Sequence, residues 1–218
     1  MSKGFGESSS WSVLIFEFMG TALLVYFAIT GDHNPLVTSL ALFTCYLLFA
    51  VISLGHFNPA VSLGVWLGNM NQTEKDENGK AKERDWCQYV SQFLMRIVAQ
   101  ILGGIGGALL AYLVLARHRP DGSFSVAPAF ITKLCPKDPY EPSQCDTTGE
   151  LKLQVYLVQA FCSFLLCLTY ASVPKETTSK DNIVKAICIA LTFFGLAHIG
   201  RIAGASFNPV LSGSTMFF

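Results

Sequence analysis

Charge is scarce in this sequence. Asp, Glu, Lys and Arg make up only 14% of its 218 residues, against roughly 25% in soluble domains, and its 15 basic and 15 acidic residues cancel. Without a basic surplus the chain lacks the electrostatic footprint of a nucleic-acid-binding protein, and we expect no such partner. The few charges gather between long apolar runs, which is not the pattern of a soluble domain.

Catalytic constellations are also missing. The sequence offers no nucleophile with a base, no His, Cys or carboxylate cluster at metal-ligand spacing, and no glycine-rich phosphate loop. We therefore expect neither an enzyme nor a bound metal or cofactor. The stretch before the first apolar run has Lys3 as its only basic residue and lacks the features of a removable signal peptide.

Cysteine occurs at seven positions, but not as a disulfide framework. Those inside apolar runs have the ordinary role of small buried thiols. They are Cys45, Cys162, Cys167 and Cys188. Cys135 and Cys145 share a polar loop, and the sequence leaves open whether they form a disulfide.

Long apolar runs are what the chain does have, and 51% of its residues are hydrophobic. A helix that crosses a bilayer needs about 20 mostly apolar residues, and five runs are long enough. The fold class is therefore an all-α polytopic membrane protein. The runs are Trp11–Thr30, Leu36–Leu54, Tyr89–Ala116, Leu153–Val173 and Ile183–Gly200.

Two short stretches, Gly55–Val61 and Ala205–Val210, share the sequence Phe-Asn-Pro. Proline is favoured in the first helical turn, and Asn is a favoured N-cap. Because each stretch follows an apolar run, we expect each to open a half-helix at corresponding places in a duplicated chain. The segment Ser62–Gly68 is apolar but too short to cross a membrane, which predicts a re-entrant segment.

The order of the runs predicts an inverted repeat within a single transmembrane domain, residues 1–218. Residues 11–116 form the first repeat, and residues 152–218 form an incomplete second repeat. Three spans per repeat is an odd number, so the second repeat enters the membrane in the opposite sense and both half-helix N-termini meet near the midplane. Irregular backbone at that depth is tolerated only inside protein or beside a cavity, which implies a pathway.

Two further patterns concern packing and orientation. Gly103 and Gly107 lie at the four-residue spacing that lets helices approach closely in lipid, with packing inside the chain favoured over a subunit contact. Lys and Arg are more numerous on the side that holds Lys3, which predicts a cytoplasmic N-terminus and an outside location for Cys135 and Cys145.

These motifs resemble those of the aquaporin, or major intrinsic protein, family. The matching stretches span nearly the whole chain: Glu17-x-x-Gly20-Thr21, Gly55–Val61, Gln100-x-x-Gly103 and Gly204–Pro209. The resemblance implies a homotetramer in the lipid bilayer, in which each subunit has its own pore for water or small neutral solutes. It assigns the pore centre to Asn58, Pro59, Ala60, Asn208, Pro209 and Val210.

In such a pore Asn58 and Asn208 each cap a half-helix with the side-chain oxygen and turn an amide N–H towards the passing molecule. A water molecule then uses its oxygen as the acceptor of both, which interrupts a proton wire. The converging helix dipoles repel cations. The alternative is that each Asn-Pro merely starts a helix, and the pairing of two copies favours the pore.

The resemblance also assigns supporting and filtering residues. Glu17 and His56 brace the first re-entrant loop, and Gln159 takes the place of Glu17 in the second repeat. The outer selectivity filter falls at Thr38 (or Leu42 a turn later), His198, Ala205 and Leu211. Arg201 lies nearby and points to lipid headgroups or replaces the mouth charge, an alternative that the sequence leaves open with the first favoured.

The chain departs from the family pattern at two places. Leu211 stands where most members carry Arg, so we expect a wider and less positive mouth, while Val210 in place of Ala adds bulk beside the centre. We lean towards the broader pore. In addition, no sixth span follows Phe207, so the sequence is either a truncation of a longer chain or a non-conducting variant.

Three function classes compete. The first is a passive channel for water and small uncharged solutes such as glycerol and urea. A secondary transporter needs ionisable groups at the midplane, and only Glu17 and Arg96 are charged within spans, which disfavours it. The third is a structural, non-conducting tetramer, which Leu211 and the missing sixth span favour.

Overall fold

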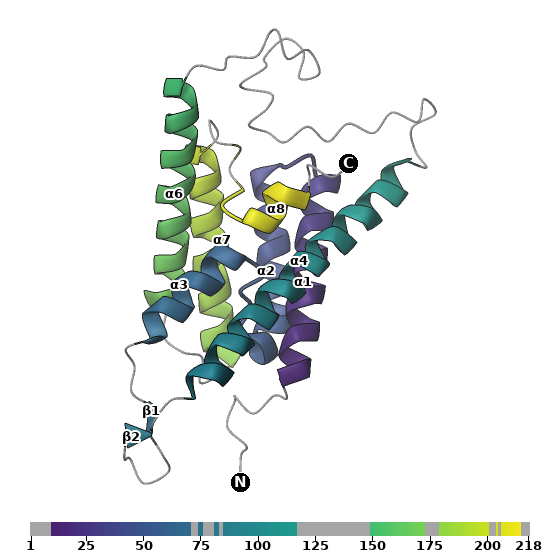
Figure 1. Ribbon diagram of the computed structural model, residues 1–218. Helices are drawn as coiled ribbons and strands as arrows, with labels where there is room; N and C mark the ends of the chain where they lie inside the picture. Colours follow the sequence, from purple (N-terminus) through teal and green to yellow (C-terminus); the bar gives the residue numbers. More distant parts are fainter. Residues whose placement is uncertain are drawn as a thin grey trace.

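A computed structural model describes residues 10–70, 74–75, 81–82, 85–116, 149–172, 179–200, 204 and 206–214 (Figure 1). These residues form helices and one small hairpin. The long helices are α1 (Ser10–Thr30), α2 (Pro35–Ser53), α4 (Trp86–Ala116), α6 (Gly149–Ser172) and α7 (Ser179–Ile199). The short elements are α3 (Pro59–Met70), α8 (Pro209–Ser214) and the antiparallel strands β1 (Glu74–Lys75) and β2 (Ala81–Lys82).

Five of these helices are long and apolar enough to cross a membrane. The five predicted spans are thereby confirmed, with ends that differ by a few residues at most. Large apolar side chains are exposed along them, such as Leu94, Val98 and Leu102 of α4, as expected of helices that face lipid. The spans are Trp11–Thr30, Pro35–Ser53, Trp86–Leu115, Leu153–Ser172 and Asp181–Ile199.

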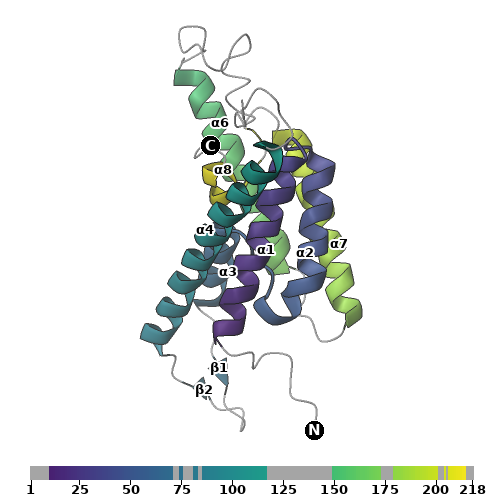
Figure 2. The ribbon, with the colours of Figure 1, turned by 90° about the vertical axis from the view of Figure 1, so that its right-hand side faces the viewer.

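Contacts between neighbouring helices close a ring. α4 packs on α1, α1 on α2, α2 on α7 and α7 on α6, and α3 contacts both α6 and α4. Figure 2 shows α1, α2 and α7 side by side, with α4 running obliquely across the bundle. The ring is thus completed by a short helix rather than by a sixth long one among the described residues.

The short helices begin inside the bundle. α3 has 12 residues and α8 has 6, which at about 1.5 Å per residue is too short to cross a hydrocarbon core about 30 Å thick. Both start near the middle of the bundle and diverge from there (Figure 1). The predicted re-entrant segment, Ser62–Gly68, lies within α3.

Glycines allow α1 and α4 to approach closely. A Cβ added at Gly103 would lie 2.4 Å from the Phe18 carbonyl oxygen, and one at Gly107 would lie 2.1 Å from the Ala22 carbonyl oxygen. Neither position has room for a side chain, because backbone cannot move aside cheaply. The small residues therefore serve packing within the chain, as the favoured alternative predicted.

The main core cluster gathers around the two loops that precede α3 and α8. Phe57 and Phe207, one from each loop, are 0% and 1% exposed and belong to the same cluster. Tyr46 of α2 and Tyr170 of α6 meet edge to face in it, with ring centroids 6.2 Å apart. Aromatic packing thus holds residues from both ends of the sequence at the centre of the ring.

Candidate functional site

The two Asn-Pro loops are joined by a reciprocal pair of hydrogen bonds. The Asn58 side-chain Nδ2 donates to the Phe207 carbonyl oxygen at 2.8 Å, and the Asn208 Nδ2 donates to the Phe57 carbonyl oxygen at 2.9 Å. Both asparagines are buried. Each therefore contacts the other's loop, and the starts of α3 and α8 lie against one another.

Each asparagine also caps its own helix. The Asn58 Oδ1 accepts from the Ala60 N–H at 2.9 Å. The Asn208 Oδ1 accepts from the N–H groups of Val210 and Leu211 at 3.1 and 3.4 Å. The oxygen is thus used at the N-terminus of the helix, as an N-cap requires, and the amide nitrogen is left for the opposite loop.

The residue before each asparagine has a strained backbone. Phe57 has φ 47° and Phe207 has φ 45°, in the left-handed region that residues with a side chain seldom occupy. Such conformations cost on the order of 1–3 kcal/mol and persist only where the surroundings fix them. Here both the N–H and the carbonyl of each phenylalanine have a hydrogen-bonded partner.

Glu17 of α1 holds the first loop. Its two carboxylate oxygens accept from the backbone N–H of His56 at 3.1 Å and of Phe57 at 2.9 Å. The Gln100 side-chain nitrogen of α4 donates to the same carboxylate at 2.8 Å. Glu17 is completely buried, so these donors replace the water that a carboxylate would otherwise need.

Gln159 of α6 holds the second loop in the same way with weaker bonds. Its Oε1 accepts from the Phe207 N–H at 3.2 Å, and its Nε2 donates to the Ser206 hydroxyl at 3.4 Å. The Ser206 hydroxyl in turn contacts that of Ser212, six residues on. In the first loop the His56 ring has the corresponding contact with Ser62.

His56 connects the first loop to α4. Its Nδ1 lies 3.1 Å from the Ser62 hydroxyl and 3.0 Å from the Arg96 guanidinium, which can only donate. The same guanidinium nitrogen lies 3.4 Å from the His56 Nε2, so Arg96 faces both ring nitrogens. Ser62 also accepts from Gln100 at 2.9 Å, so a continuous hydrogen-bonded chain runs from Glu17 to Arg96.

Tyr170 of α6 contacts the first loop from another side. Its hydroxyl donates to the Gly55 carbonyl oxygen at 3.2 Å. Gly55 has φ 65°, and a Cβ there would lie 2.8 Å from the Tyr46 ring, so the loop approaches the aromatic cluster as closely as glycine allows. Neither tyrosine stood out in the sequence, because their role depends on distant contacts.

The other residues assigned to the pore centre have separate surroundings. Pro59 and Ala60 are half-buried, and the Ala60 carbonyl accepts from the Cys167 thiol at 3.3 Å. Pro209 is exposed. Val210 turns towards α4, where its Cγ1 occupies the space that a Cβ on Gly104 would need, 2.1 Å away.

The predicted outer-filter residues make local contacts. Thr38 is buried and its hydroxyl donates to the Asn34 carbonyl at 3.1 Å, while His198 is exposed at the end of α7 and donates to the Phe194 carbonyl at 3.0 Å. Leu211 is 3% exposed and packs in a cluster with residues of α1 and α4. These contacts join no filter position to another among the described residues.

Several sequence predictions fall elsewhere. Ala205, Arg201, Cys135 and Cys145 lie outside the described residues, so the question of a disulfide and the two alternatives for Arg201 stay open. Within the described ranges no three His, Cys, Asp or Glu side chains are arranged to hold a metal ion. No protein-family model matches the chain.

Proposed function

We propose that the chain is a passive membrane channel of the aquaporin type, for water and for small uncharged solutes such as glycerol and urea. The observation that carries the proposal is the reciprocal bonding of Asn58 and Asn208 to the loops that precede α8 and α3. If each Asn-Pro only started a helix, the asparagines would need to cap their own helices but would not need to donate to the opposite loop.

Correspondences between the two loops support an inverted repeat with α3 and α8 as its half-helices. Glu17 and Gln159 each accept from the phenylalanine N–H before an asparagine. His56 with Ser62, and Ser206 with Ser212, repeat a contact six residues apart. The two loops agree in the φ angle of the phenylalanine, in the helix cap, in the side chain that accepts the phenylalanine N–H and in the contact six residues apart. A chance recurrence of Phe-Asn-Pro would not produce all four.

The chemistry follows from the amide groups. Each asparagine amide has two N–H groups, and one donates to the opposite loop. No described residue accepts the second, which is then available to the oxygen of a passing solute. A water molecule that accepts from both amides has both lone pairs of its oxygen occupied. It can then donate to the neighbouring waters but cannot accept a proton from them, so the proton wire is interrupted, and the helix N-termini disfavour cations.

The second candidate is a structural, non-conducting membrane tetramer, and one observation favours it. The Tyr170 hydroxyl already donates to the Gly55 carbonyl, and its buried ring packs in the aromatic cluster beside the first loop. The Gly55 carbonyl then has one of its two lone pairs occupied by a protein donor, which leaves it less able to accept from water. In this candidate the Asn58 and Asn208 bonds serve only to join the two halves.

Both candidates share the same setting. The chain lies in a lipid bilayer as a homotetramer, with a cytoplasmic N-terminus as the distribution of Lys and Arg favours. The direct test is stopped-flow shrinkage of proteoliposomes against water, glycerol and urea. We expect faster exchange of water than in protein-free liposomes, and slower exchange when Asn58→Ala and Asn208→Ala are combined.

Asn34→Ala is the matched control, because Asn34 caps α2 without joining a second loop. Tyr170→Phe separates the two candidates. If the wild type exchanges no solute and Tyr170→Phe exchanges water, Tyr170 closes a real channel. If neither exchanges water, glycerol or urea, the channel proposal is wrong and the structural tetramer stands.

A further inference from the structure

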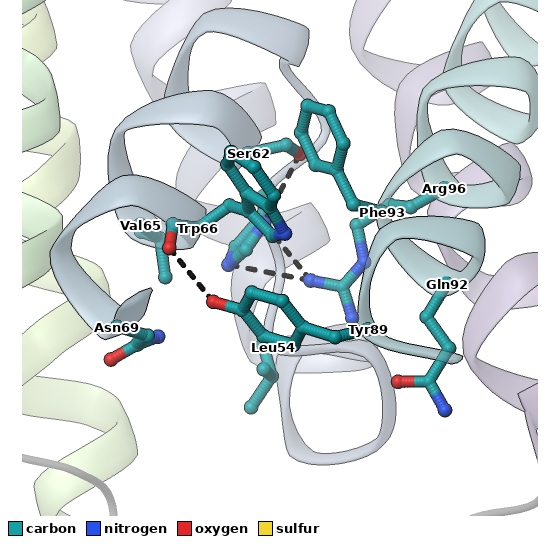
Figure 3. A pocket seen from close by; sticks show the side chains of 10 residues that line it. Leu54, Ser62, Val65, Trp66, Asn69, Tyr89, Gln92, Phe93 and Arg96 are labelled. Atoms are coloured by element: carbon teal, nitrogen blue, oxygen red, sulfur yellow. Dashed lines mark hydrogen bonds between the residues drawn. The ribbon is translucent and has the colours of Figure 1, made fainter. Parts of the chain in front are cut away.

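A cavity of about 150 Å³ lies between α3 and the first turns of α4, and Leu54 and His56 of the loop that precedes α3 also line it (Figure 3). At about 30 Å³ per water molecule it has room for a few waters or one small polyatomic ion, and it is well below the roughly 300 Å³ of drug-sized pockets. Among the described residues, its wall includes Arg96 and no carboxylate.

Arg96 lacks a counterion among the described residues. Its guanidinium reaches from α4 to the His56 ring, with one nitrogen 3.0 Å from Nδ1. A guanidinium has five N–H donors, and the neutral imidazole supplies no negative charge. A cation within an apolar helix is costly unless it is paired. The wall therefore needs a negatively charged hydrogen-bond acceptor to pair with Arg96.

Trp66, which lines the same wall, carries a second donor. The Nε1–H of Trp66 is buried and has no acceptor among the described residues. The indole stacks on Tyr89 and Phe93, with ring centroids 5.5 and 4.9 Å away, and the Tyr89 hydroxyl donates to the Trp66 carbonyl at 2.8 Å. The indole is therefore held in place although its own N–H is unsatisfied (Figure 3).

We propose that this cavity is a binding site for one small oxyanion, a phosphate or carboxylate group, held by Arg96 and the Trp66 Nε1–H. An anion supplies the charge that Arg96 lacks and the acceptor that Trp66 lacks. The phosphate of an anionic lipid headgroup and a free phosphate ion share this chemistry. The site does not depend on conduction, and its test measures binding alone.

The same wall leads to the first Asn-Pro loop. Arg96 contacts His56, and Ser62 and Gln100 continue the hydrogen bonds to Glu17, which holds the Phe57 N–H. An anion that draws the guanidinium towards itself weakens the contact with His56. Occupancy of the cavity is therefore coupled to the loop that positions Asn58.

The test uses Trp66 as its own reporter. Trp11→Phe and Trp86→Phe together leave Trp66 as the only tryptophan, and the full chain is purified in a maltoside detergent, which contains no phosphate. Inorganic phosphate is titrated in one series, a short-chain phosphatidylglycerol in a second, and an uncharged diacylglycerol in a third. We expect a saturable change in Trp66 fluorescence with phosphate, phosphatidylglycerol or both, and none with diacylglycerol.

Arg96→Gln should weaken the binding about tenfold or more, since hydrogen bonds to a charged group are lost. His198→Gln in α7 changes a polar side chain that is absent from the wall of the cavity, and should leave binding unchanged. If Arg96→Gln does not fold, Arg96→Lys replaces it, because the charge stays and the planar fork is lost.

A response to phosphate alone identifies a free anion, and a response to phosphatidylglycerol identifies a lipid. No saturable response in the wild-type background, or one that the Arg96 variants do not weaken, overturns the proposal.

Discussion

Glu17 and Gln159, which are 142 positions apart in the printed sequence, perform the same task on opposite loops. Each accepts the backbone N–H of a phenylalanine in the left-handed region, at 2.9 Å for Glu17 and 3.2 Å for Gln159. The two braces are not equal. Glu17 accepts from three donors and carries a charge, whereas Gln159 is a neutral amide that accepts the Phe207 N–H at the longer distance.

Removing the two braces should therefore have unequal effects. Glu17→Ala leaves the buried His56 and Phe57 N–H groups without acceptors, at about 1–3 kcal/mol for each. Gln159→Ala leaves one such N–H. We expect Glu17→Ala to lower the melting temperature in detergent more than Gln159→Ala. Equal losses would show that the charge and the extra donors of Glu17 contribute nothing.

The energetic coupling between the hydrogen bonds of Asn58 and Asn208 can be measured by a double-mutant cycle. Asn58→Ala and Asn208→Ala each remove one bond between the loops, and the remaining bond depends on the same loop geometry. Neighbouring groups of this kind show coupling energies of about 0.5–3 kcal/mol. Asn34→Ala is the control: it should cost about 1 kcal/mol as a lost cap and add independently to either change. Additivity between positions 58 and 208 would contradict the reciprocal contact.

Val210 and Gly104 should compensate for one another. Gly104→Ala places a Cβ 2.1 Å from the Val210 Cγ1, and overpacking of this kind costs about 1–3 kcal/mol. Val210→Ala in the same chain should restore most of that loss in a thermal unfolding measurement. Gly106→Ala is the matched control, because its nearest neighbour is Phe18 at 3.6 Å, and should be neutral. Failure of Val210→Ala to rescue would place Val210 elsewhere.

Cys87 reports on orientation. It is exposed at the start of α4, whereas Cys45 is buried in α2. In a chain with Cys87 as the only cysteine, an impermeant maleimide should label only after the cells are permeabilised, because a cytoplasmic N-terminus puts this end of α4 inside. A chain with Cys45 alone should stay unlabelled in both conditions. Labelling of Cys87 in intact cells would reverse the topology.

His33 gives a pH dependence to the turn between α1 and α2. Burial lowers the pKa of its imidazole below the usual 6.5, and the neighbouring Asp32 opposes this in part. As the pH falls, His33 is protonated in the unfolded chain before it is protonated in the folded chain. Its contribution to the free energy of unfolding is therefore fully present above pH 6.5 and decreases as the pH drops towards the lowered pKa of the folded state. His33→Asn keeps a residue that tolerates φ 51° and should reduce the change in melting temperature between pH 7 and pH 5. An unchanged pH dependence would assign it to other groups.

The spans and the helix starts could be predicted because their causes are local. An apolar run of about 20 residues predicts a spanning helix, and Asn before Pro predicts a cap. The observed cap of α2 by Asn34 uses the same pair of residues, with Asn34 Oδ1 2.9 Å from the Leu36 nitrogen, although it lies in an ordinary turn. The dipeptide alone therefore predicts a helix start and not a site.

Contacts across the fold could not be predicted in the same way. Arg96 stood out in the sequence as a charge without an evident partner, and its partner is the His56 ring, 40 positions away. The motif places Leu211 at the outer filter, which stays a prediction, and it does not foretell that the side chain packs with residues of α1 and α4. Which way a half-helix turns its side chains depends on its neighbours, and one short motif does not fix that rotation.

The reciprocal hydrogen bonds between the two asparagine loops also set an order of events during synthesis. Asn58 and the Phe207 carbonyl to which it donates are separated by 149 positions, so the bond cannot form until Phe207 has been made. At about 5–20 residues per second, the first loop waits roughly 7–30 s for its partner. During that interval the strained Phe57 is held by Glu17 of α1 and by its ring contact with Phe49 of α2, while the Asn58 amide has no Phe207 carbonyl to donate to. Insertion of the first three spans must therefore yield an intermediate whose central loop is still open, and closure of that loop is a late step of assembly.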